Sequence, residues 1–383
     1  DKNQTNTTHG PFLRSPVLGG ELAEIVTLEE LDAAVEQQAL DRLAEPWKEK
    51  IFDEFGDNVF SPDPCDFHNW EAHRVGDNLI QHDIQLKPDA EPFQSRVIRQ
   101  GPAATREMVR MLRDFQNRGL FYKCQSRYTS PCFLVKKKSG KFRLVSNFQK
   151  LNSMTLTYPT HIPLIQDVLH SLSNGAILSS MDISDSFFIV RNSPRAEKYS
   201  AIETPIGVLC PTRMQQGLCG SPWTLQRLIS AIFEKETFGT KQEPEGWLST
   251  YFDDVTVRTS GPPTIEGSVQ EHYEKLRGVL LKMKKHGIPL NPAKSQLFKL
   301  NIEILGYLAG QGKVRMDRKK VQTILDMEPP TNVPEVRRLM GLVQHNRTFI
   351  RGLAKFTAPI AKLTGKNGFE WNDECSEAFS KLK

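Results

Sequence analysis

The sequence lacks the features that would place it in a membrane or among small secreted proteins. No apolar run approaches the roughly 18 residues that a membrane-spanning helix needs, and no secretory-signal pattern opens the chain. Cysteine is scarce, and the six cysteines form no CxxC pair and show no regular spacing. We therefore expect reduced thiols in a cytosolic environment, not a disulfide framework or a zinc site. Cys65, His68 and His73 also fit no common zinc spacing.

Apolar residues are plentiful enough for packed cores. Hydrophobic residues make up 38% of the 383-residue chain and charged residues 25%, and the 21 phenylalanines outnumber tyrosine and tryptophan together. This balance excludes a disordered or collagen-like chain. The length is above that of an ordinary single domain, so we expect two or three compact units.

Charge is divided unevenly along the chain. Residues 1–90 carry 7 basic and 19 acidic side chains, a balance of −12. Residues 91–383 carry 43 basic and 26 acidic side chains, a balance of +17. An acidic head on a basic body is consistent with polyanion binding by the larger part. The alternative is that this charge only solvates the surface, and composition alone does not decide between the two.

Residue spacing predicts helices and strands that follow no regular order. Helical periodicity and caps predict helices over residues 27–43, 47–55, 106–117, 163–172, 223–233, 271–286 and 334–353. Pro46 is expected to end the first of these helices or to begin the second. Alternation and turn residues predict strands or hairpins over residues 83–87, 132–135, 141–145, 176–183, 248–257 and 298–308. Because no strand–helix–strand rhythm is present, the pattern favours an α+β fold.

Two adjacent aspartates stand among apolar strand residues in the segment Tyr251-Phe252-Asp253-Asp254. Neighbouring carboxylates repel each other and raise each other's pKa, which a divalent cation relieves. Adjacent strand side chains point to opposite faces, so a further carboxylate is needed, and Asp182 is the only one on an apolar strand upstream. Two such strands can hold two Mg²⁺ ions about 3.5–4 Å apart for in-line attack at phosphorus. The alternative is an exposed turn with solvated aspartates.

The segments around these acids agree with one family in order and spacing. They are residues 82–92 (HDIQLKPDAEP), 119–120, 128–143 (YTSPCFLVKKKSGKFR), 151–152, 158–163, 181–188 (MDISDSFF), 214–222 (MQQGLCGSP), 251–254, 305–307, 334–350 and 369–383. Over these segments the chain resembles the reverse transcriptases of retroviruses and gypsy-type LTR retrotransposons. Residues 145–149 (VSNFQ), where that family usually has Val-Asp-Tyr-Arg, mark a divergent member.

The resemblance implies a right-hand polymerase of fingers, palm and thumb, with an antiparallel palm sheet and an N-terminal helical extension. It divides the chain into an acidic extension (1–82), fingers (83–157 and 190–219), palm (158–189 and 220–312), thumb (313–365) and the start of a connection region (366–383). No set of RNase H carboxylates follows, so we expect no RNase H activity from this chain. The acidic extension matches no family motif. Its role is left open between a spacer from an upstream protease, a regulatory clamp and a dimerisation element.

The resemblance also implies an RNA- and DNA-directed DNA polymerase, a nucleotidyltransferase that adds dNTPs to a primer 3′ end. Its catalytic metal centre would comprise Asp182, Asp253, Asp254 and Ile183, with two Mg²⁺ ions or Mn²⁺ as a substitute. The residues implied for nucleotide binding are Lys137, Arg143, Asp185, Ser186, Phe187 and Gln216. The residues implied for the primer grip are Leu305, Gly306 and Tyr307. For the three lysines at residues 136–138, the alternative to nucleotide binding is a solvated loop. The lysine on either side of Lys137 could also take its role.

Phe187 lies where the family places a bulky aromatic ring under the sugar of the incoming nucleotide. A ring there leaves no room for a 2′-hydroxyl, so dNTPs are accepted and rNTPs rejected. Without the resemblance, Phe187 would be interpreted as a core residue. Downstream, the basic residues of 313–320 and of the helix at 334–353 are expected to neutralise nucleic-acid phosphates, or else to form a solvated face.

The implied partners are an RNA/DNA template–primer duplex and dNTPs, without a membrane. A homodimer and association with the RNase H, protease and integrase parts of a polyprotein are left open. We expect a cytoplasmic location within virus-like particles, with nuclear access open. Two rival interpretations are a catalytically silent polymerase-fold scaffold and an RNA-directed RNA polymerase. The three retained aspartates argue against the first, and Phe187 argues against the second.

Overall fold

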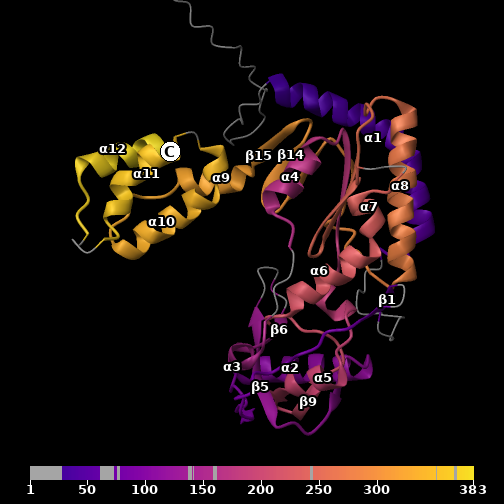
Figure 1. Cartoon of the computed structure of the whole chain (residues 1–383), viewed down its shortest axis with the longest axis vertical. Helices are drawn as coiled ribbons and strands as arrows, with labels where there is room; N and C mark the ends of the chain where they lie inside the picture. Colours follow the sequence, from indigo (N-terminus) through magenta and orange to yellow (C-terminus); the bar gives the residue numbers. More distant parts are fainter. Residues whose placement is uncertain are drawn as a thin grey trace, which may run out of the picture.

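The computed structural model describes residues 28–60, 73–75, 78–136, 140, 142–157, 162–241, 245–350, 352–365 and 369–383. Figure 1 shows a central sheet flanked by long helices, a lobe of strands and short helices below it, and an arm of helices to one side. The predictions for residues 1–27, 61–72, Lys137 and 158–161 lie outside the described residues. Among the helices in the described ranges, none combines the length and apolar character that a membrane crossing requires.

A four-stranded antiparallel sheet lies at the centre of the molecule. Its strand order is β10 (Leu248–Tyr251), β11 (Asp254–Thr259), β7 (Ile177–Asp182) and β12 (Gln296–Lys299). The helices around it are α1 (Leu28–Phe55), α4 (Ile165–Ser173), α6 (Ser221–Ile232), α7 (Glu234–Phe238) and α8 (Glu266–Lys285). All of β7 but its last residue is buried, because α4 and α8 lie on opposite sides of the sheet (Figure 1).

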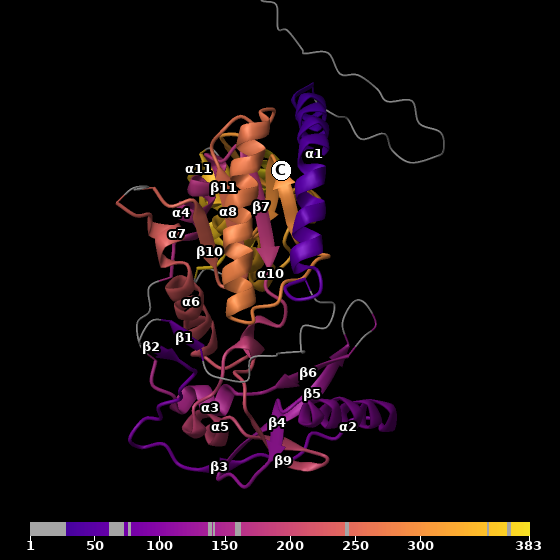
Figure 2. The same cartoon turned by 90° about the vertical axis from the view of Figure 1, so that its right-hand side faces the viewer.

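Helix α1 packs beside α8 and completes the cover of the sheet (Figure 2). The prediction that Pro46 divides two helices is wrong, since one helix runs through it. Pro46 removes a backbone hydrogen bond, but Leu40 and Ile51 on either side are fully buried in the same core, which holds the helix together. At the end of α1, Glu54 Oε2 accepts a hydrogen bond from Arg277 Nε of α8 at 2.7 Å.

The lower lobe is built on a six-stranded sheet in the order β3-β5-β8-β9-β4, with β6 paired to β5. Its strands are β3 (Phe93–Gln94), β4 (Phe121–Lys123), β5 (Tyr128–Lys136), β6 (Phe142–Ser146), β8 (Ile202–Thr204) and β9 (Gly207–Pro211). Its helices are α2 (Pro102–Asn117), α3 (Gln149–Met154) and α5 (Pro194–Tyr199), and the hairpin β1 (His73–Val75)–β2 (Asn78–Ile80) joins it to the centre. The β5–β6 hairpin confirms the predicted strands there.

The strand predicted at residues 83–87 is wrong. The segment is extended, but it joins the fold through isolated bridges, from His82 to Asn192 and from Leu86 to Thr155. These two partners belong to different segments of the lobe, so no continuous ladder forms. Pro88, which has no N–H to donate, then ends any further pairing.

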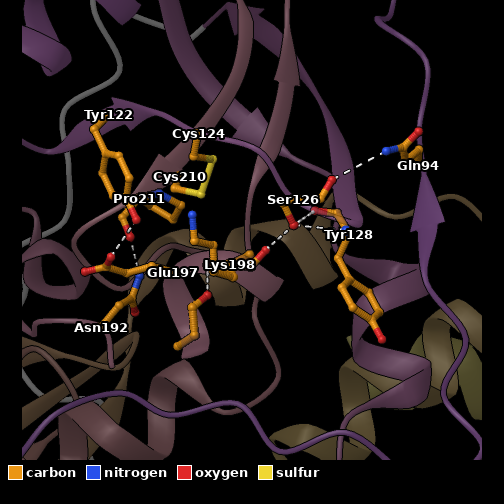
Figure 3. The surroundings of a disulfide bond; sticks show 12 residues. Gln94, Tyr122, Cys124, Ser126, Tyr128, Asn192, Glu197, Lys198, Cys210 and Pro211 are labelled. Carbon is orange, nitrogen blue, oxygen red and sulfur yellow. Dashed lines mark hydrogen bonds between the residues drawn. A yellow bond between two sulfur atoms is a disulfide. The ribbon is translucent and has the colours of Figure 1, made fainter. Parts of the chain in front are cut away.

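A disulfide joins Cys124 to Cys210 in the lower lobe (Figure 3), so the prediction of reduced thiols is wrong for this pair. The two cysteines are 86 residues apart in the sequence, and the pairing of β4 with β9 brings their Cα atoms to 5.8 Å. Spacing along the chain could not reveal a contact that only the sheet creates. Cys132, Cys219 and Cys375 are free thiols, as predicted.

The arm of helices follows a small three-stranded sheet, β13 (Asn301–Ile304), β14 (Tyr307–Gly310) and β15 (Lys313–Met316). Its elements are α9 (Arg318–Leu325), α10 (Val333–His345), η2 (Arg347–Phe349), α11 (Leu353–Lys362) and α12 (Asp373–Leu382). The single helix predicted at 334–353 is wrong. The chain breaks after α10, where Asn346 caps the helix end and Gly352 takes a left-handed φ of 72°, so that α11 folds back on α10.

The disulfide gives a first test. Reducing it is expected to lower the free energy of unfolding by about 2–4 kcal/mol, because the cross-link closes a long loop and restricts the unfolded chain. The measurement is urea unfolding with and without reductant, for the wild type and for Cys124→Ser. Cys219→Ser, which removes a free thiol, is the matched control and should keep its response to reductant. An unchanged wild-type midpoint in reductant would contradict the disulfide.

Candidate active site

Strand pairing brings the three predicted aspartates to one end of the central sheet. Asp182, the last residue of β7, is the register partner of Asp254, the first residue of β11. Asp253 precedes it in the turn after β10, and its carbonyl oxygen accepts a hydrogen bond from Ile183 N at 2.9 Å. The prediction that two strands each present an aspartate at one place is therefore confirmed.

The turn that carries Asp253 is strained and held from outside. Phe252 has a left-handed φ of 53°, which is disfavoured for a bulky side chain. Its amide donates a 2.7 Å hydrogen bond to Gln226 Oε1, and Gln226 Nε2 donates to Thr250 Oγ1 of β10 at 3.3 Å. Gln226 is almost fully buried in α6. It escaped the sequence analysis, although a glutamine on the apolar face of a predicted helix was a usable signal.

Burial and mutual repulsion raise the pKa of both turn aspartates. Loss of solvation is the largest cause for Asp254, and together with the charges of Asp253 and Asp182 it raises the pKa of that carboxyl to about 6. The pKa of Asp253 is also raised, chiefly by burial and to a smaller extent by Asp182. Three neighbouring acids in this environment ionise together only at a cost in free energy, unless a cation joins them.

One cation of the chain already lies on this centre. Lys294 Nζ is 3.0 Å from Asp182 Oδ2 and 3.2 Å from Oδ1. The backbone places it there, because Asn291 N donates to Asp182 O at 2.9 Å and Lys294 N donates back to Asn291 O in the following turn. Lys294 was also missed. Its sequence signal was only an Asn-Pro-Ala-Lys turn, and nothing in the spacing linked that turn to β7.

A cleft of about 620 Å³ opens between the central sheet and the lower lobe. Asp182 and Asp253 line it from the sheet, together with Ile183 and Lys294. Five of the six residues predicted to bind nucleotide line the same cleft: Arg143, Asp185, Ser186, Phe187 and Gln216. The structure thus joins residues that are far apart in the sequence into one cavity. Asp254 is not among the described residues that line it, and the sixth nucleotide residue, Lys137, lies outside the described ranges.

A tight turn after β7 presents Phe187 to the cleft. Asp185 takes a left-handed φ of 42° and accepts a 2.8 Å hydrogen bond from Phe188 N through its carbonyl oxygen. The short helix η1 (Ser186–Ile189) follows, with Ser186 buried and Phe187 half-buried. Phe188 is half-buried, packs against the main hydrophobic core and contacts the ring of Phe115.

The loop with Gln216 is fixed by hydrogen bonds to α3. Asn152 Nδ2 donates to Gly217 O at 2.8 Å, and Asn152 Oδ1 accepts from Cys219 N at 3.0 Å. Gly217 has a φ of 92°, which an L-residue rarely adopts. Gln216 itself is exposed at the cleft, free to meet a ligand from a rigid loop.

The predicted primer-grip residues lie elsewhere. Leu305 and Gly306 form the turn between β13 and β14, and Tyr307 begins β14. This three-stranded sheet packs against α4 and leads into the arm of helices. None of the three is among the described residues that line the cleft.

The donor set suits a hard divalent cation. Carboxylate oxygens are the ligands that Mg²⁺ and Mn²⁺ prefer, burial and neighbouring acids raise the pKa of Asp253 and Asp254, and the Lys294 ammonium is paired with Asp182. In the described ranges, no three acidic, histidine or cysteine side chains converge closely enough to hold an ion as they stand. A cation would therefore have to draw the carboxylates together and take the place of Lys294 on Asp182.

Solved structures identify the class of fold. The chain aligns over 96% of its length with a foamy viral protease–reverse transcriptase in complex with double-stranded DNA, with a TM-score of 0.75, 19% identity and 61% of that chain covered. A second foamy viral structure, in complex with an RNA/DNA hybrid, aligns over 95% of this chain and 47% of that one, with a TM-score of 0.71 and 17% identity. The protein has the right-hand polymerase fold of these enzymes.

Sequence relatives identify the family. The profile described as "Reverse transcriptase (RNA-dependent DNA polymerase)" matches residues 135–308. The retrovirus-related Pol polyprotein from transposon opus of Drosophila melanogaster is 30% identical over 265 residues, which are 67% of this chain and 25% of that protein. The Pol polyprotein of feline endogenous virus ECE1 is 27% identical over 309 residues, 78% of this chain and 29% of the relative. The chain belongs to the reverse transcriptases of LTR retrotransposons and retroviruses, and it spans about a quarter of the length of these relatives.

The raised pKa of Asp254 gives a second test, made in metal-free buffer. Because the folded-state pKa of about 6 lies above the ordinary value of 3.8, wild-type stability should fall as pH rises through that interval and stay reduced above it. Asp254→Asn has no charge to bury, so its Tm relative to the wild type should rise by a few degrees between pH 4 and pH 8.

The measurement is thermal unfolding in EDTA at pH 4, 6 and 8. Asp89→Asn is the matched control, since Asp89 is exposed, and its Tm difference from the wild type should stay constant. An Asp254→Asn difference that does not change with pH would contradict the raised pKa.

Proposed function

We propose that the chain is the polymerase part of a gypsy-type LTR retroelement, an RNA- and DNA-directed DNA polymerase that extends a primer with dNTPs. The observation that carries this proposal is the cleft that joins Asp182 and Asp253 of the central sheet to Arg143 and Gln216 of the lower lobe. Acids that can hold metal ions on one wall and a guanidinium for phosphates on the other meet the two requirements of phosphoryl transfer.

The three regions of the molecule would then correspond to the fingers, palm and thumb of a right-hand polymerase. The lower lobe (83–157 and 190–219) would be the fingers, the central part (158–189 and 220–312) the palm, and 313–365 the thumb. The last helix, α12, lies in the predicted connection region (366–383), and it shares a hydrophobic core with α10 and α11. α1 would be the part of the N-terminal extension that braces the palm through α8.

Asp182 and Asp253 would hold two Mg²⁺ ions, with Asp254 in a supporting role and the Ile183 carbonyl as a further ligand. When bound, the metal ions supply charge neutralisation at the triphosphate and lower the pKa of the primer 3′-hydroxyl. The chain keeps this set ready through two supports, Gln226 on the turn and Lys294 on Asp182. Both act on the free protein, before any ligand arrives.

The cleft residues would bind the incoming nucleotide. Arg143 would offer a bidentate fork to the triphosphate, and Lys137 would add a point charge. Gln216 is exposed on a fixed loop and would hydrogen-bond near the sugar. Asp185 and Ser186 lie in the chain between β7 and Phe187 and line the cleft. They would help to position the nucleotide there.

The nucleic-acid partner would be a template–primer duplex. The foamy viral relatives are solved in complex with double-stranded DNA and with an RNA/DNA hybrid. In this chain the basic excess lies in residues 91–383, outside the acidic extension. Phosphate neutralisation by such an excess is independent of base sequence, as a polymerase requires, and makes binding weaken with salt.

Primer extension tests the proposed activity. With an RNA template, a DNA primer, Mg²⁺ and dNTPs, the wild type should extend the primer. Asp253→Asn should lower the rate by about a thousandfold or more, because it removes a metal-binding charge worth several kcal/mol in the transition state. Asp89→Asn, an exposed change of the same chemistry, should extend at the wild-type rate.

Two results would support a rival function instead. Duplex binding by the wild type with no incorporation would indicate a silent scaffold. Equal incorporation by Asp253→Asn would contradict the metal-binding role proposed for Asp253. Incorporation of rNTPs in preference to dNTPs would indicate an RNA polymerase. The aspartates and Phe187 all stand in place in the cleft or at its edge, which favours the DNA polymerase.

Phe187 gives a test of sugar selection. Phe187→Val should keep dNTP incorporation and raise rNTP incorporation by about 100-fold, since the ring no longer fills the space of the 2′-hydroxyl. The measurement is kcat/KM for dCTP and for CTP on one template. Phe188→Val, a change of the same size at the neighbouring half-buried ring, is the control and should leave the ratio unchanged. A constant ratio in Phe187→Val would contradict the assignment.

A further inference from the structure

The turn between β13 and β14 is strained in a way that needs an external support. Ile304 pairs with Tyr307, so Leu305 and Gly306 alone make the turn. Both have left-handed φ values, 53° for Leu305 and 77° for Gly306, as a two-residue type I′ turn requires. Leucine is disfavoured in this left-handed conformation. Strain of this kind persists only where the surrounding structure fixes it, and it gathers at functional sites.

Lys320 of α9 supplies that support. Its Nζ donates a 3.2 Å hydrogen bond to Leu305 O, and its side chain lies directly over Gly306. A Cβ atom added at Gly306 would come within 2.3 Å of both Cε and Nζ of Lys320. The left-handed backbone favours glycine at this position, and any larger residue would displace the end of the Lys320 side chain.

Three more contacts join the turn and the adjacent Tyr307 to the arm of helices. Lys320 Nζ lies 4.5 Å from the centre of the Tyr307 ring, a cation–π distance. The ring of Phe349, from η2 between α10 and α11, stacks on Tyr307 at 5.3 Å with a 25° angle between the planes. At the start of α9, Asp317 N donates to Gly306 O at 3.3 Å. Residues from the start and from the middle of the arm thus contact the turn or the residue that follows it.

We propose that Lys320 is a positioning residue that couples the thumb to the primer-grip turn, so that the turn holds its place against the primer strand only while α9 is docked on it. This inference rests on the proposed function and on the primer-grip role that the family resemblance implies for Leu305, Gly306 and Tyr307. Lys320 acts through the turn and contacts no reacting group. Its loss weakens the grip on the primer without altering nucleotide binding.

The contacts of Lys320 distinguish this role from an ordinary phosphate contact. Its ammonium is directed to a backbone carbonyl and an aromatic face, and its side chain is partly buried. A lysine that binds phosphate directly contributes to the salt dependence of duplex binding, with a slope of nearly one per contact. A lysine that only positions a turn changes the affinity for the duplex by the same factor at every salt concentration, so the slope of the salt dependence stays unchanged.

The first measurement needs no activity. Hydrogen exchange of the peptide covering residues 301–310 should be about tenfold faster in Lys320→Met than in the wild type, because the support of the turn is gone. Lys320→Arg keeps a charged donor and should restore the protection. Lys355→Met, which removes an exposed charge from α11, is the matched control and should exchange as the wild type does.

The second measurement separates grip from chemistry. For Lys320→Met, Kd for a template–primer duplex should rise about tenfold at each of several salt concentrations, the effect of one lost charge-assisted hydrogen bond. Processivity should fall with it, while KM for dNTP stays within about twofold. Gly306→Ala, whose new methyl group displaces the lysine and strains the left-handed backbone, should give at least the same defect, and adding Lys320→Met to Gly306→Ala should bring no further loss.

Each contrary result overturns the coupling. Wild-type exchange and processivity in Lys320→Met would show that the lysine does not hold the turn. If Lys320→Met reduces the slope of the salt dependence of duplex binding by about one, the lysine contacts a phosphate directly. Additive defects in the double variant would show two independent effects. If the wild type extends no primer at all, the proposed function fails, and the exchange experiment still decides whether Lys320 fixes the turn.

Discussion

Asp182 and Asp254 stand opposite each other because β7 and β11 pair there, and Asp253 precedes Asp254 in the turn, so that three acids lie close together at one end of the sheet. Burial, together with the repulsion among the acids, raises the pKa of the two turn aspartates, so that ionising them together costs free energy. Lys294 reduces this cost, because its ammonium pairs with the Asp182 carboxylate. In the proposed function, a divalent cation bound by the same acids would reduce it in the same way.

Two hairpin turns in the molecule are strained and supported in the same way. Phe252 beside the acids and Leu305 at the predicted primer grip are both bulky residues in the left-handed region. Each turn is held by a polar side chain from a helix that packs against it, Gln226 of α6 in the first case and Lys320 of α9 in the second. A turn with asparagine and glycine would be stable alone. These turns instead depend on the packing of the neighbouring helices, α6 and α9, for their support.

Much of the fold could be predicted because local patterns were strong. The helices α2, α4, α6 and α8 and the hairpins β5–β6, β10–β11 and β13–β14 lie where periodicity and turn residues indicated. The errors fell where tertiary contacts outweighed local signals. Core packing carried α1 through Pro46, Gly352 allowed the arm to fold back, and residues 83–87 found no strand to pair with along their length.

The sequence by itself determined which residues are chemically able to act, since acids, arginine, glutamine and glycine at ordered spacing are properties of the chain. It also determined the class of fold through that spacing. Only the tertiary structure decided which distant residues meet. Arg143 reaches the cleft of Asp182 because the lower lobe folds back over the sheet, and Cys124 meets Cys210 across 86 residues because β4 pairs with β9. Lys294 and Lys320 carry no sequence signal of their roles, because a lysine becomes a counter-ion or a support only through what packing places within about 3 Å of its ammonium group.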